Sequence, residues 1–332
     1  MTNWQNILGF DPTLIGPNGS GWIPPVERDA EMTAINDAVL SLMPSFGDVN
    51  AGDDLPDEVL LCDLELKAMG KVLQFRQWSG SCVGTAAAKA YLQAAAGDAV
   101  VRGDAEIVKP CFPYATYGMG RKLGGFNRTG EGSFGAAQAR AVKEWGELQG
   151  DDPRLPQPNA EALAAGWVSY SERIEIEWSY PSNWPISEAT LRADANQYQI
   201  LDTAQVRTTK ELQRGLSQGY GATLASMFGS RNQQVNDGYL IADWNDRWAH
   251  QMSCGGYSTH PRLGILFWIQ NQWGATIHPK CPKMNAKGVV GGCGWITERN
   301  MAEIIRTGEV FIHSNTEGFP VRKIDWGTQG IV

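Results

Sequence analysis

RQWSGSCVGTAAAKAYLQAAAG, residues 76–97, places one cysteine between a turn rich in Gly and Ser and a long run of helix-forming residues. The run predicts a helix from Cys82 to Gly97, because Ala favours helices and Gly often follows their last turn. Unpaired backbone N–H groups and the helix dipole favour a thiolate at the first turn of a helix. The stretch therefore predicts a lowered pKa for the Cys82 thiol. Taken alone, Cys82 also fits the alternative of a buried, inert cysteine.

Composition narrows the class of protein. The 332 residues are 42% hydrophobic and 19% charged, which is typical of a globular protein of about two domains or lobes. A formal net charge of -8 argues against nucleic acid as a partner, since phosphates attract clustered Lys and Arg. No basic, then apolar leader begins the chain, and no run approaches about 18 apolar residues. We therefore expect no signal peptide, no transmembrane segment and no membrane partner.

The pattern along the chain changes from helical to strand-like. Residues 1–55 are rich in Pro, Gly and acidic residues and predict an arm with one helix at 30–43. Further helices are predicted from Ser133 as cap to Gly146, over 208–219 with capping-box spacing, and over 297–308. Short apolar runs between glycines predict strands at 221–228, 250–257, 263–271 and 291–297. Helices first and strands second predict an α+β protein with two lobes.

Two residues of the strand-rich part could support chemistry at Cys82. A thiolate nucleophile needs a proton carrier, and the chain has four histidines. His250 opens HQMSCGGY (250–257), a predicted strand, and Asn271 ends LGILFWIQN (263–271). Adjacent strands would bring Asn271 to the ring of His250, and Trp273 would keep water from that hydrogen bond. Taken singly, His250 also fits a core histidine and Asn271 a strand-end residue.

Three sequence blocks together resemble a known family. QWSGSCVG (77–84), HQMSCGGY and WIQNQWG (268–274) are similar to the active-site blocks of the papain-like cysteine peptidases, in the order Cys, His, Asn. LPDEVLLCD (55–63) resembles the start of the family's catalytic domain. Residues 114–126 and 131–146 are more similar to bacterial and viral members than to plant ones. The resemblance covers about residues 55–310.

The resemblance implies a fold and a division of the chain. The expected fold is α+β, a papain-like two-lobe fold, in which a helical lobe with its central helix starting at Cys82 faces an antiparallel, β-barrel-like lobe. Residues 1–55 would be an arm, either a propeptide or a docking segment. Residues 56–312 would be the catalytic domain, with a helical lobe at about 76–200 and a β-rich lobe at about 201–297. Residues 313–332 would be a tail.

The resemblance also assigns roles to four residues. Cys82 would be the nucleophile, His250 the general acid and base, and Asn271 the residue that orients His250. Gln77 would complete an oxyanion hole with the backbone N–H of Cys82. The family's glutamine lies six residues before the cysteine, where this chain has Arg76, so Gln77 fits only if the turn is one residue shorter. A residue of an exposed turn is the alternative for Gln77.

Three other departures from the family are visible. Ser79 occupies a position where many members have a disulfide-forming cysteine, and Val83 replaces an aromatic residue. The interval from Cys82 to His250 exceeds the family's roughly 130 to 150 residues, because of insertions between 147 and 207 that we expect to shape the substrate groove.

The function that follows is a cysteine endopeptidase that acts on protein or peptide substrates without a cofactor. One alternative is a papain-like structural protein of an assembly, such as a phage virion, with weak or no catalysis. Another is acyl transfer to an amine through the same three residues. The expected location is cytoplasmic or virion-associated, with the arm as a docking segment for a larger assembly.

The remaining cysteines and histidines suggest a metal-site alternative. The six cysteines are too few for a disulfide-built fold, and Cys281 and Cys293 are the best candidates for one bridge or for two free thiols. His278 with these two, or His250 with Cys254, would supply zinc ligands. The chain has no Cys-x-x-Cys pair among these residues, so we expect no metal.

Overall fold

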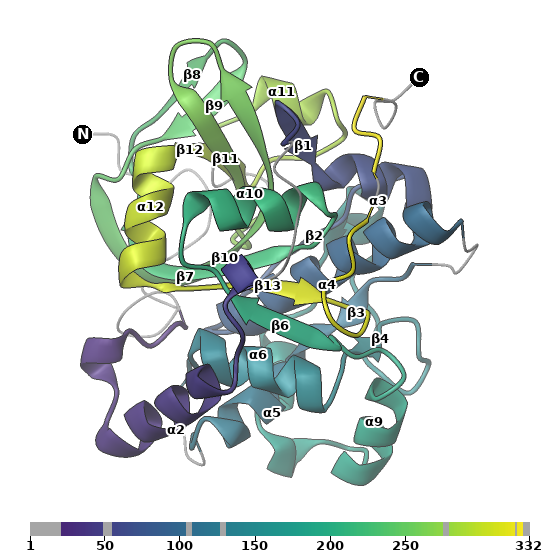
Figure 1. Cartoon of the computed structure of the whole chain (residues 1–332). Coiled ribbons are helices and arrows are strands. Elements are labelled where there is room, and N and C mark those ends of the chain that lie inside the picture. The colour runs from purple at the N-terminus through teal and green to yellow at the C-terminus, as the bar shows by residue number, and fades with distance from the viewer. Residues whose placement is uncertain are drawn as a thin grey trace.

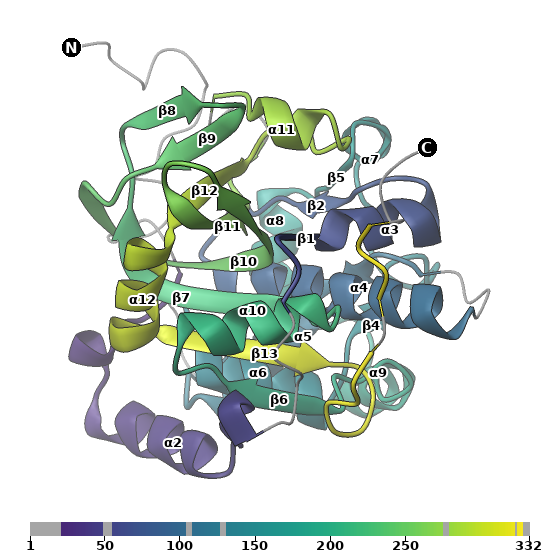
Figure 2. The ribbon, with the colours of Figure 1, turned by 45° about the horizontal axis from the view of Figure 1, so that its top comes forward.

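The computed structural model describes residues 21–48, 55–103, 108–126, 131–274, 279–322 and 324–327. Helices surround one long central helix, and a mixed sheet packs against that helix (Figures 1 and 2). The α+β class predicted from the sequence is confirmed. The contact between the central helix and the sheet matters for function, because the central helix begins at Cys82.

Helix α4 (Cys82–Arg102) is the central helix, and residues on every side of it are buried. Its alanines have small side chains, so neighbouring elements approach closely on all faces. The predicted end at Gly97 is wrong, because the helix continues to Arg102 and ends at Gly103, whose φ is 69°. A Cβ at Gly97 would lie 2.9 Å from the carbonyl oxygen of Gly219, so this glycine permits close packing and does not end the helix.

Three shorter helices pack against α4: α3 (Leu61–Met69), α5 (Pro113–Leu123) and α6 (Gly135–Glu144). Farther out, α7 (Ala160–Ala164) contacts β5, α8 (Glu172–Trp178) contacts α5, and α9 (Glu188–Ala195) contacts β4. Gly84 lets α5 approach α4, since a Cβ there would lie 2.7 Å from the Cβ of Tyr117. The predicted cap of the 133–146 helix is wrong: Phe134 precedes α6, and Ser133 instead pairs with Trp22 of the N-terminal segment.

The main sheet contains nine of the strands in the described ranges. Its order is β6-β13-β7-β10-β11-β12-β9-β8, and β1 pairs with β10. The bounds are β1 (Glu58–Leu60), β6 (Asp202–Gln205), β7 (Ala222–Gly229), β8 (Gln233–Asn236), β9 (Tyr239–Ala242), β10 (Asp246–His260), β11 (Gly264–Gln270), β12 (Cys293–Thr297) and β13 (Glu309–Ser314). The strand order is an open path and β12 pairs with β9 in parallel, so the expected antiparallel, barrel-like closure is not confirmed.

Helices cover both faces of this sheet. On one face, α10 (Thr209–Ser217) and α12 (Glu298–Thr307) pack against β7, and on the other α4 and α6 do so (Figures 1 and 2). The cap predicted for α10 is present, because Thr208 accepts from the Glu211 N–H at 3.1 Å. Thr297 caps α12 in the same way and accepts from the Asn300 N–H at 3.4 Å. The capping box at α10 is incomplete, because the Glu211 carboxylate accepts from Arg207 N–H instead.

Small elements complete the fold. Strands β2 (Gln74–Phe75) and β5 (Trp167–Val168) pair in parallel, and β3 (Cys111–Phe112) and β4 (Leu148–Gln149) pair antiparallel. The short helices are η2 (Pro25–Glu27), η3 (Phe46–Asp48), η4 (Pro181–Asn183) and α11 (Pro282–Asn285). The predicted N-terminal helix is present as α2 (Ala30–Ser41), capped by Asp29, and it packs on α6.

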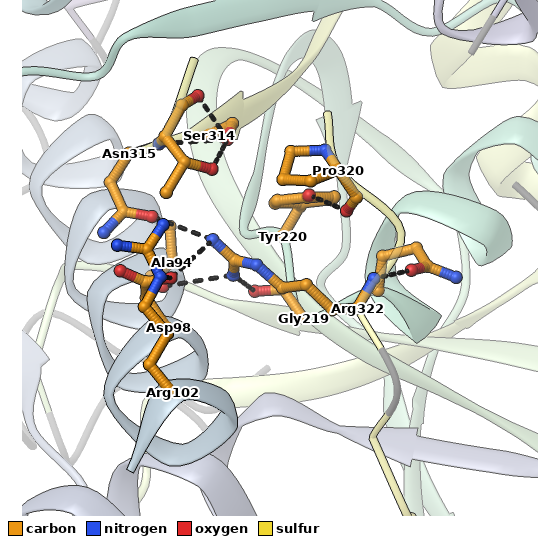
Figure 3. Close-up of polar contacts among 11 residues, drawn as sticks. Ala94, Asp98, Arg102, Gly219, Tyr220, Ser314, Asn315, Pro320 and Arg322 are labelled. Carbon is orange, nitrogen blue, oxygen red and sulfur yellow. Dashed lines mark hydrogen bonds and ion pairs between the residues drawn. The ribbon is translucent and has the colours of Figure 1, made fainter. Parts of the chain in front are cut away.

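The C-terminal segment returns to the central helix. Arg322 is buried, and its guanidinium lies 4.4 Å from the ring centre of Tyr220 (Figure 3). It donates to the carbonyl of Ala94 on α4 at 3.3 Å and to Asn315 Oδ1 at 3.0 Å, and lies 3.6 Å from Asp98 (Figure 3). One side chain therefore links α4, the connection between α10 and β7, and the residues that follow β13.

Candidate active site

Cys82 is the first residue of α4, at the point where the central helix meets β10. Its side chain is fully buried, and burial raises the pKa of the Cys82 thiol to about 12. Hydrogen bonds from the backbone N–H groups of Gln251, Val83 and Cys82 itself act in the opposite direction but are weaker. The predicted lowering of the Cys82 pKa is therefore wrong for this conformation. Burial destabilises the thiolate more than the N–H groups near the helix terminus stabilise it.

His250 lies inside β10, next to Gln251, whose N–H bonds the Cys82 thiol. It pairs with Ser226 of β7, and the register shifts between Arg247 and His250. Strand pairing fixes the backbone that carries the imidazole. The structure thus brings Cys82 and the His250 segment together, although they are far apart in sequence.

Asn271 directly follows β11 and holds the ring of His250. His250 Nε2 and Asn271 Oδ1 are 3.0 Å apart, in the contact predicted from the strand ends. The Asn271 N–H in turn donates to the carbonyl of Gly292 at 2.8 Å. Because the backbone of Asn271 is tied to the segment before β12, its side chain presents a fixed acceptor to the histidine.

Trp273 lies over the histidine ring, with ring centres 4.6 Å apart and planes 29° from parallel. A cavity of about 20 Å³ lies beside these residues and is lined in part by Trp248, His250, Asn271 and Trp273. That volume holds one water at most. The cover predicted for Trp273 is therefore present.

Gln77 is fully buried, so the alternative of an exposed turn residue is wrong. Its backbone N–H donates to the Gln272 carbonyl at 2.8 Å, and its side-chain Nε2 donates to the Ser79 carbonyl at 3.0 Å. Gln77 therefore ties the turn before Cys82 to the segment after Asn271. Arg76, at the family's glutamine position, stacks on the Trp78 ring at 3.5 Å.

The N-terminal segment, expected from the sequence to be a propeptide or a docking segment, lies against the same turn. A Cβ at Gly21 would lie 2.0 Å from the carbonyl oxygen of Gly80, so the two backbones are in direct contact. Trp22 is buried in the hydrophobic cluster that contains Cys82 and donates to Glu309 at 3.1 Å. Arg28 forms an ion pair with Glu309 at 2.6 Å. Residues 21–28 are thus anchored beside the start of α4.

The metal alternative finds no support in the described ranges. No three His, Cys, Asp or Glu side chains of those ranges form a group that would hold a metal ion, and His278 lies outside them. Cys281 and Cys293 are free thiols joined by a hydrogen bond, which lowers the pKa of Cys281 and raises that of Cys293. Their proximity agrees with their choice as the best disulfide candidates.

No helix in the described ranges combines the length and the apolar character that crossing a bilayer requires.

Comparison with known proteins gives similarity in structure only. No protein-family model matches the sequence, and the search of curated proteins found no match. Xylellain, a cysteine protease from Xylella fastidiosa, aligns with a TM-score of 0.56 and 16% identity over 90% of this chain and 97% of its own. The proform of the ragweed pollen cysteine protease Amb a 11 aligns with a TM-score of 0.49 and 14% identity over 81% and 67% of the two chains. Bromelain from Ananas comosus gives 0.47 and 12% over 78% and 99%. At these identities the similarity to xylellain establishes the architecture, and the chain has a papain-like fold.

Proposed function

We propose that the protein is a cysteine peptidase that hydrolyses peptide bonds with Cys82, His250 and Asn271. The observation that carries the proposal is the 3.0 Å hydrogen bond between His250 Nε2 and Asn271 Oδ1, beside the helix terminus that holds Cys82. These three residue types, in this relation, suffice for nucleophilic attack on an amide carbonyl. The papain-like fold supports this function without establishing it.

In the first step, His250 Nδ1 takes the proton of the Cys82 thiol, and the sulfur attacks the carbonyl carbon of the substrate. The C–N bond then breaks while the imidazolium returns the proton to the leaving amine. A thioester joins Cys82 to the acyl part of the substrate. In the second step, His250 removes a proton from water, the hydroxide attacks the thioester, and the free thiol and an acid are released.

The tetrahedral intermediates carry a negative oxygen that needs hydrogen-bond donors. The Cys82 backbone N–H supplies one, and the Gln77 side-chain amide supplies another. Gln77 Nε2 has two protons, and the Ser79 carbonyl accepts one of them at 3.0 Å. We assign the second proton to the oxyanion.

We propose that the N-terminal arm limits access to the nucleophile. Cys82 is fully buried, and Gly21 lies in direct contact with Gly80 two residues before it. Movement of residues 21–28 would hydrate the thiol and lower its pKa, because burial is the main cause of the raised value. The arm would thus act as a propeptide or be displaced when it docks elsewhere.

Burial of Cys82 also favours a second candidate function. A neutral, inaccessible thiol is what a papain-like component of an assembly, such as a phage particle, would tolerate. In that case His250 and Asn271 would serve packing, and residues 1–55 would dock the chain.

Thiol labelling separates these functions. An active-site-directed electrophile at pH 5 to 6, with the modified residue mapped by mass spectrometry, is expected to label Cys82 at least about tenfold faster than the other cysteines. His250→Ala should abolish that advantage, Cys82→Ala should remove the label, and Trp22→Ala should accelerate labelling by loosening the arm. Folded protein that reacts at Cys82 no faster than at Cys254 or Cys111 would favour the assembly component. Products formed with added amines would identify acyl transfer.

A further inference from the structure

Glu175 is a buried carboxylate that the mechanism above does not use. It lies on α8, inside the insertion between 147 and 207, and is far from Cys82 in sequence. Its side chain reaches the turn at residues 78–81, which leads directly into α4. Burying a carboxylate destabilises the folded chain unless hydrogen-bond donors surround it. The donors around Glu175 therefore show which segment the carboxylate holds in place.

All the donors that reach one oxygen of Glu175 come from this turn. Glu175 Oε2 accepts from the backbone N–H of Trp78 at 2.9 Å and of Ser79 at 3.1 Å. It also accepts from the hydroxyls of Ser79 at 3.1 Å and Ser81 at 3.0 Å. The other oxygen, Oε1, accepts from the Tyr114 hydroxyl of α5 at 2.8 Å. Hydrogen bonds to an ionised acceptor are roughly twice as strong as neutral ones, so the ionised carboxylate fixes the turn firmly.

The two proposed oxyanion donors, on Gln77 and Cys82, lie directly on either side of this turn. The Ser79 carbonyl, whose own residue is held twice by Glu175, accepts the Gln77 side-chain amide at 3.0 Å. The Ser81 hydroxyl donates to Glu175, and Ser81 directly precedes Cys82, whose backbone N–H is the other proposed donor. Displacing the turn would therefore move both donors relative to the substrate carbonyl.

We propose that Glu175 is a positioning residue, whose ionised carboxylate holds the 78–81 turn so that the Gln77 amide and the Cys82 N–H face the developing oxyanion. The inference rests on the proposed function. Its specific consequence is that turnover responds to the protonation of Glu175, whereas simple alkylation of Cys82, which forms no oxyanion, does not.

Protonation of Glu175 is reachable near neutral pH. Burial raises the pKa of Glu175 to about 7, and the hydrogen bonds from the turn and from Tyr114 oppose that rise. A protonated carboxyl can donate from Oε1 to the Tyr114 hydroxyl, because that hydroxyl also has the Arg76 carbonyl as an acceptor at 3.2 Å. Glu175 Oε2 would then still accept hydrogen bonds from the turn, but as a neutral and therefore weaker acceptor.

The ionisable groups that interact with this carboxylate are Arg76, which precedes the turn, and the Tyr114 hydroxyl of α5. Tyr170, in the loop before α8, packs edge-on against the Tyr114 ring. Arg76 interacts favourably with the ionised form. Glu131 holds the next amide of the turn, Gly80 N–H, at 2.7 Å, and burial raises the pKa of Glu131 as well.

Stability and turnover should respond to Glu175 in opposite directions. The pKa of Glu175 is higher in the folded than in the unfolded chain, so its contribution to folding is full below pH 4.5 and is lost as pH rises through about 7. The proposed effect on turnover instead increases over the same range. A purely structural carboxylate would not produce a rise in turnover where stability falls.

Glu175→Gln is the decisive variant because it mimics the protonated acid. Its amide oxygen can face the turn and its NH2 group can donate to the Tyr114 hydroxyl. Between pH 5 and 9, the rate of Cys82 alkylation by iodoacetamide and the kcat for a peptide substrate are measured for wild type and variant. We expect alkylation within about threefold of wild type at every pH, but kcat about tenfold lower above pH 8 and unchanged near pH 5. Glu177→Gln, on the same helix in an exposed pair with Arg173, is the matched control and should follow wild type.

The outcomes are distinguishable. A wild type that alkylates at Cys82 only at the background rate overturns the proposed function and this inference with it. An active wild type with a Glu175→Gln variant of equal or higher kcat above pH 8, or with alkylation and kcat reduced in parallel, overturns the inference alone. If the variant does not fold, the wild-type profiles decide: kcat must show an ionisation near pH 7 that alkylation lacks, and identical profiles exclude it.

Discussion

At the scale of single residues, the orientation of His250 depends on a neighbour, Asn271, that is itself held in place by another hydrogen bond. His250 bonds Asn271, and Asn271 is itself tied through its backbone to Gly292. Trp273 stacks on the imidazole and keeps bulk water away from the bond. The orientation of the proposed base is therefore set by residues that do not contact the substrate in the mechanism.

Asn271→Ala tests that orientation. Loss of the Oδ1 acceptor leaves a buried imidazole nitrogen without its partner and frees the ring to rotate, and misplacement of about 1 Å can reduce a rate about 100-fold. We expect kcat to fall between about tenfold and 100-fold, with a smaller effect on KM. Asn232→Ala, at an exposed position before β8, is the control. Wild-type kcat in a folded Asn271→Ala variant would contradict the role.

At the scale of elements, β13 places a histidine where it stays neutral. His313 is buried between two strands, with Thr223 Oγ1 of β7 2.9 Å from Nε2 and Thr203 Oγ1 of β6 3.4 Å from Nδ1. Burial lowers the pKa of His313 to about 3. The middle of the sheet thus contains a group that the unfolded chain protonates more readily than the folded one.

The sign of the pH effect follows from that difference. Between about pH 6.5 and 3, His313 is protonated in the unfolded chain but neutral in the folded chain. Acidification over this range therefore lowers the free energy of unfolding by up to about 1.4 kcal/mol per pH unit. His313→Gln should flatten the decrease in the free energy of unfolding over this range, measured by urea denaturation at pH 7, 6 and 5. An unchanged slope would show that other groups cause the acid sensitivity.

Local patterns predicted the elements better than their contacts. The cap at Thr208 and the pairing of His250 with Asn271 follow from short stretches of sequence and were predicted. The role of Gly97 was not, because it depends on the carbonyl of a residue that follows α10.

The ionisation behaviour of the site could not be predicted from local sequence, because it depends on which elements pack around each group. The helix terminus predicted a lowered pKa for Cys82, whereas burial by surrounding elements reverses the direction. The contacts of Glu175 with the 78–81 turn span a long separation in sequence, and no motif marks ERIEIEW (172–178) as a partner of that turn. Long-range contacts of this kind leave no local pattern.

At the scale of the whole molecule, the two ends of the described chain are fastened to the body. Residues 21–28 lie beside the start of α4 through Glu309, and Arg322 lies against its later turns through Ala94 and Asp98. Figure 3 shows the second contact, in which α4 and the segment after β13 meet at one guanidinium. The central helix is thus held at both ends by segments that follow or precede the core elements.

Arg322→Ala measures the worth of the second contact. The substitution removes the cation from the Tyr220 ring and leaves the Ala94 and Gly219 carbonyls without this donor, which should lower the free energy of unfolding by about 2 to 4 kcal/mol. Urea denaturation checks the value, and Arg306→Ala, exposed on α12, should cost less than about 1 kcal/mol. A similar loss for both variants would refute a special role for Arg322.

The position of β13 has a consequence for how the protein is made. β13 lies between β6 and β7, so β6 has no neighbour in the sheet until residues 309–314 have been synthesised. Glu309, which fastens Trp22 and Arg28 beside Cys82, belongs to the same late strand. A chain emerging from the ribosome therefore cannot pair β6 in the sheet, or fasten its N-terminal arm beside Cys82, until residues 309–314 have been translated.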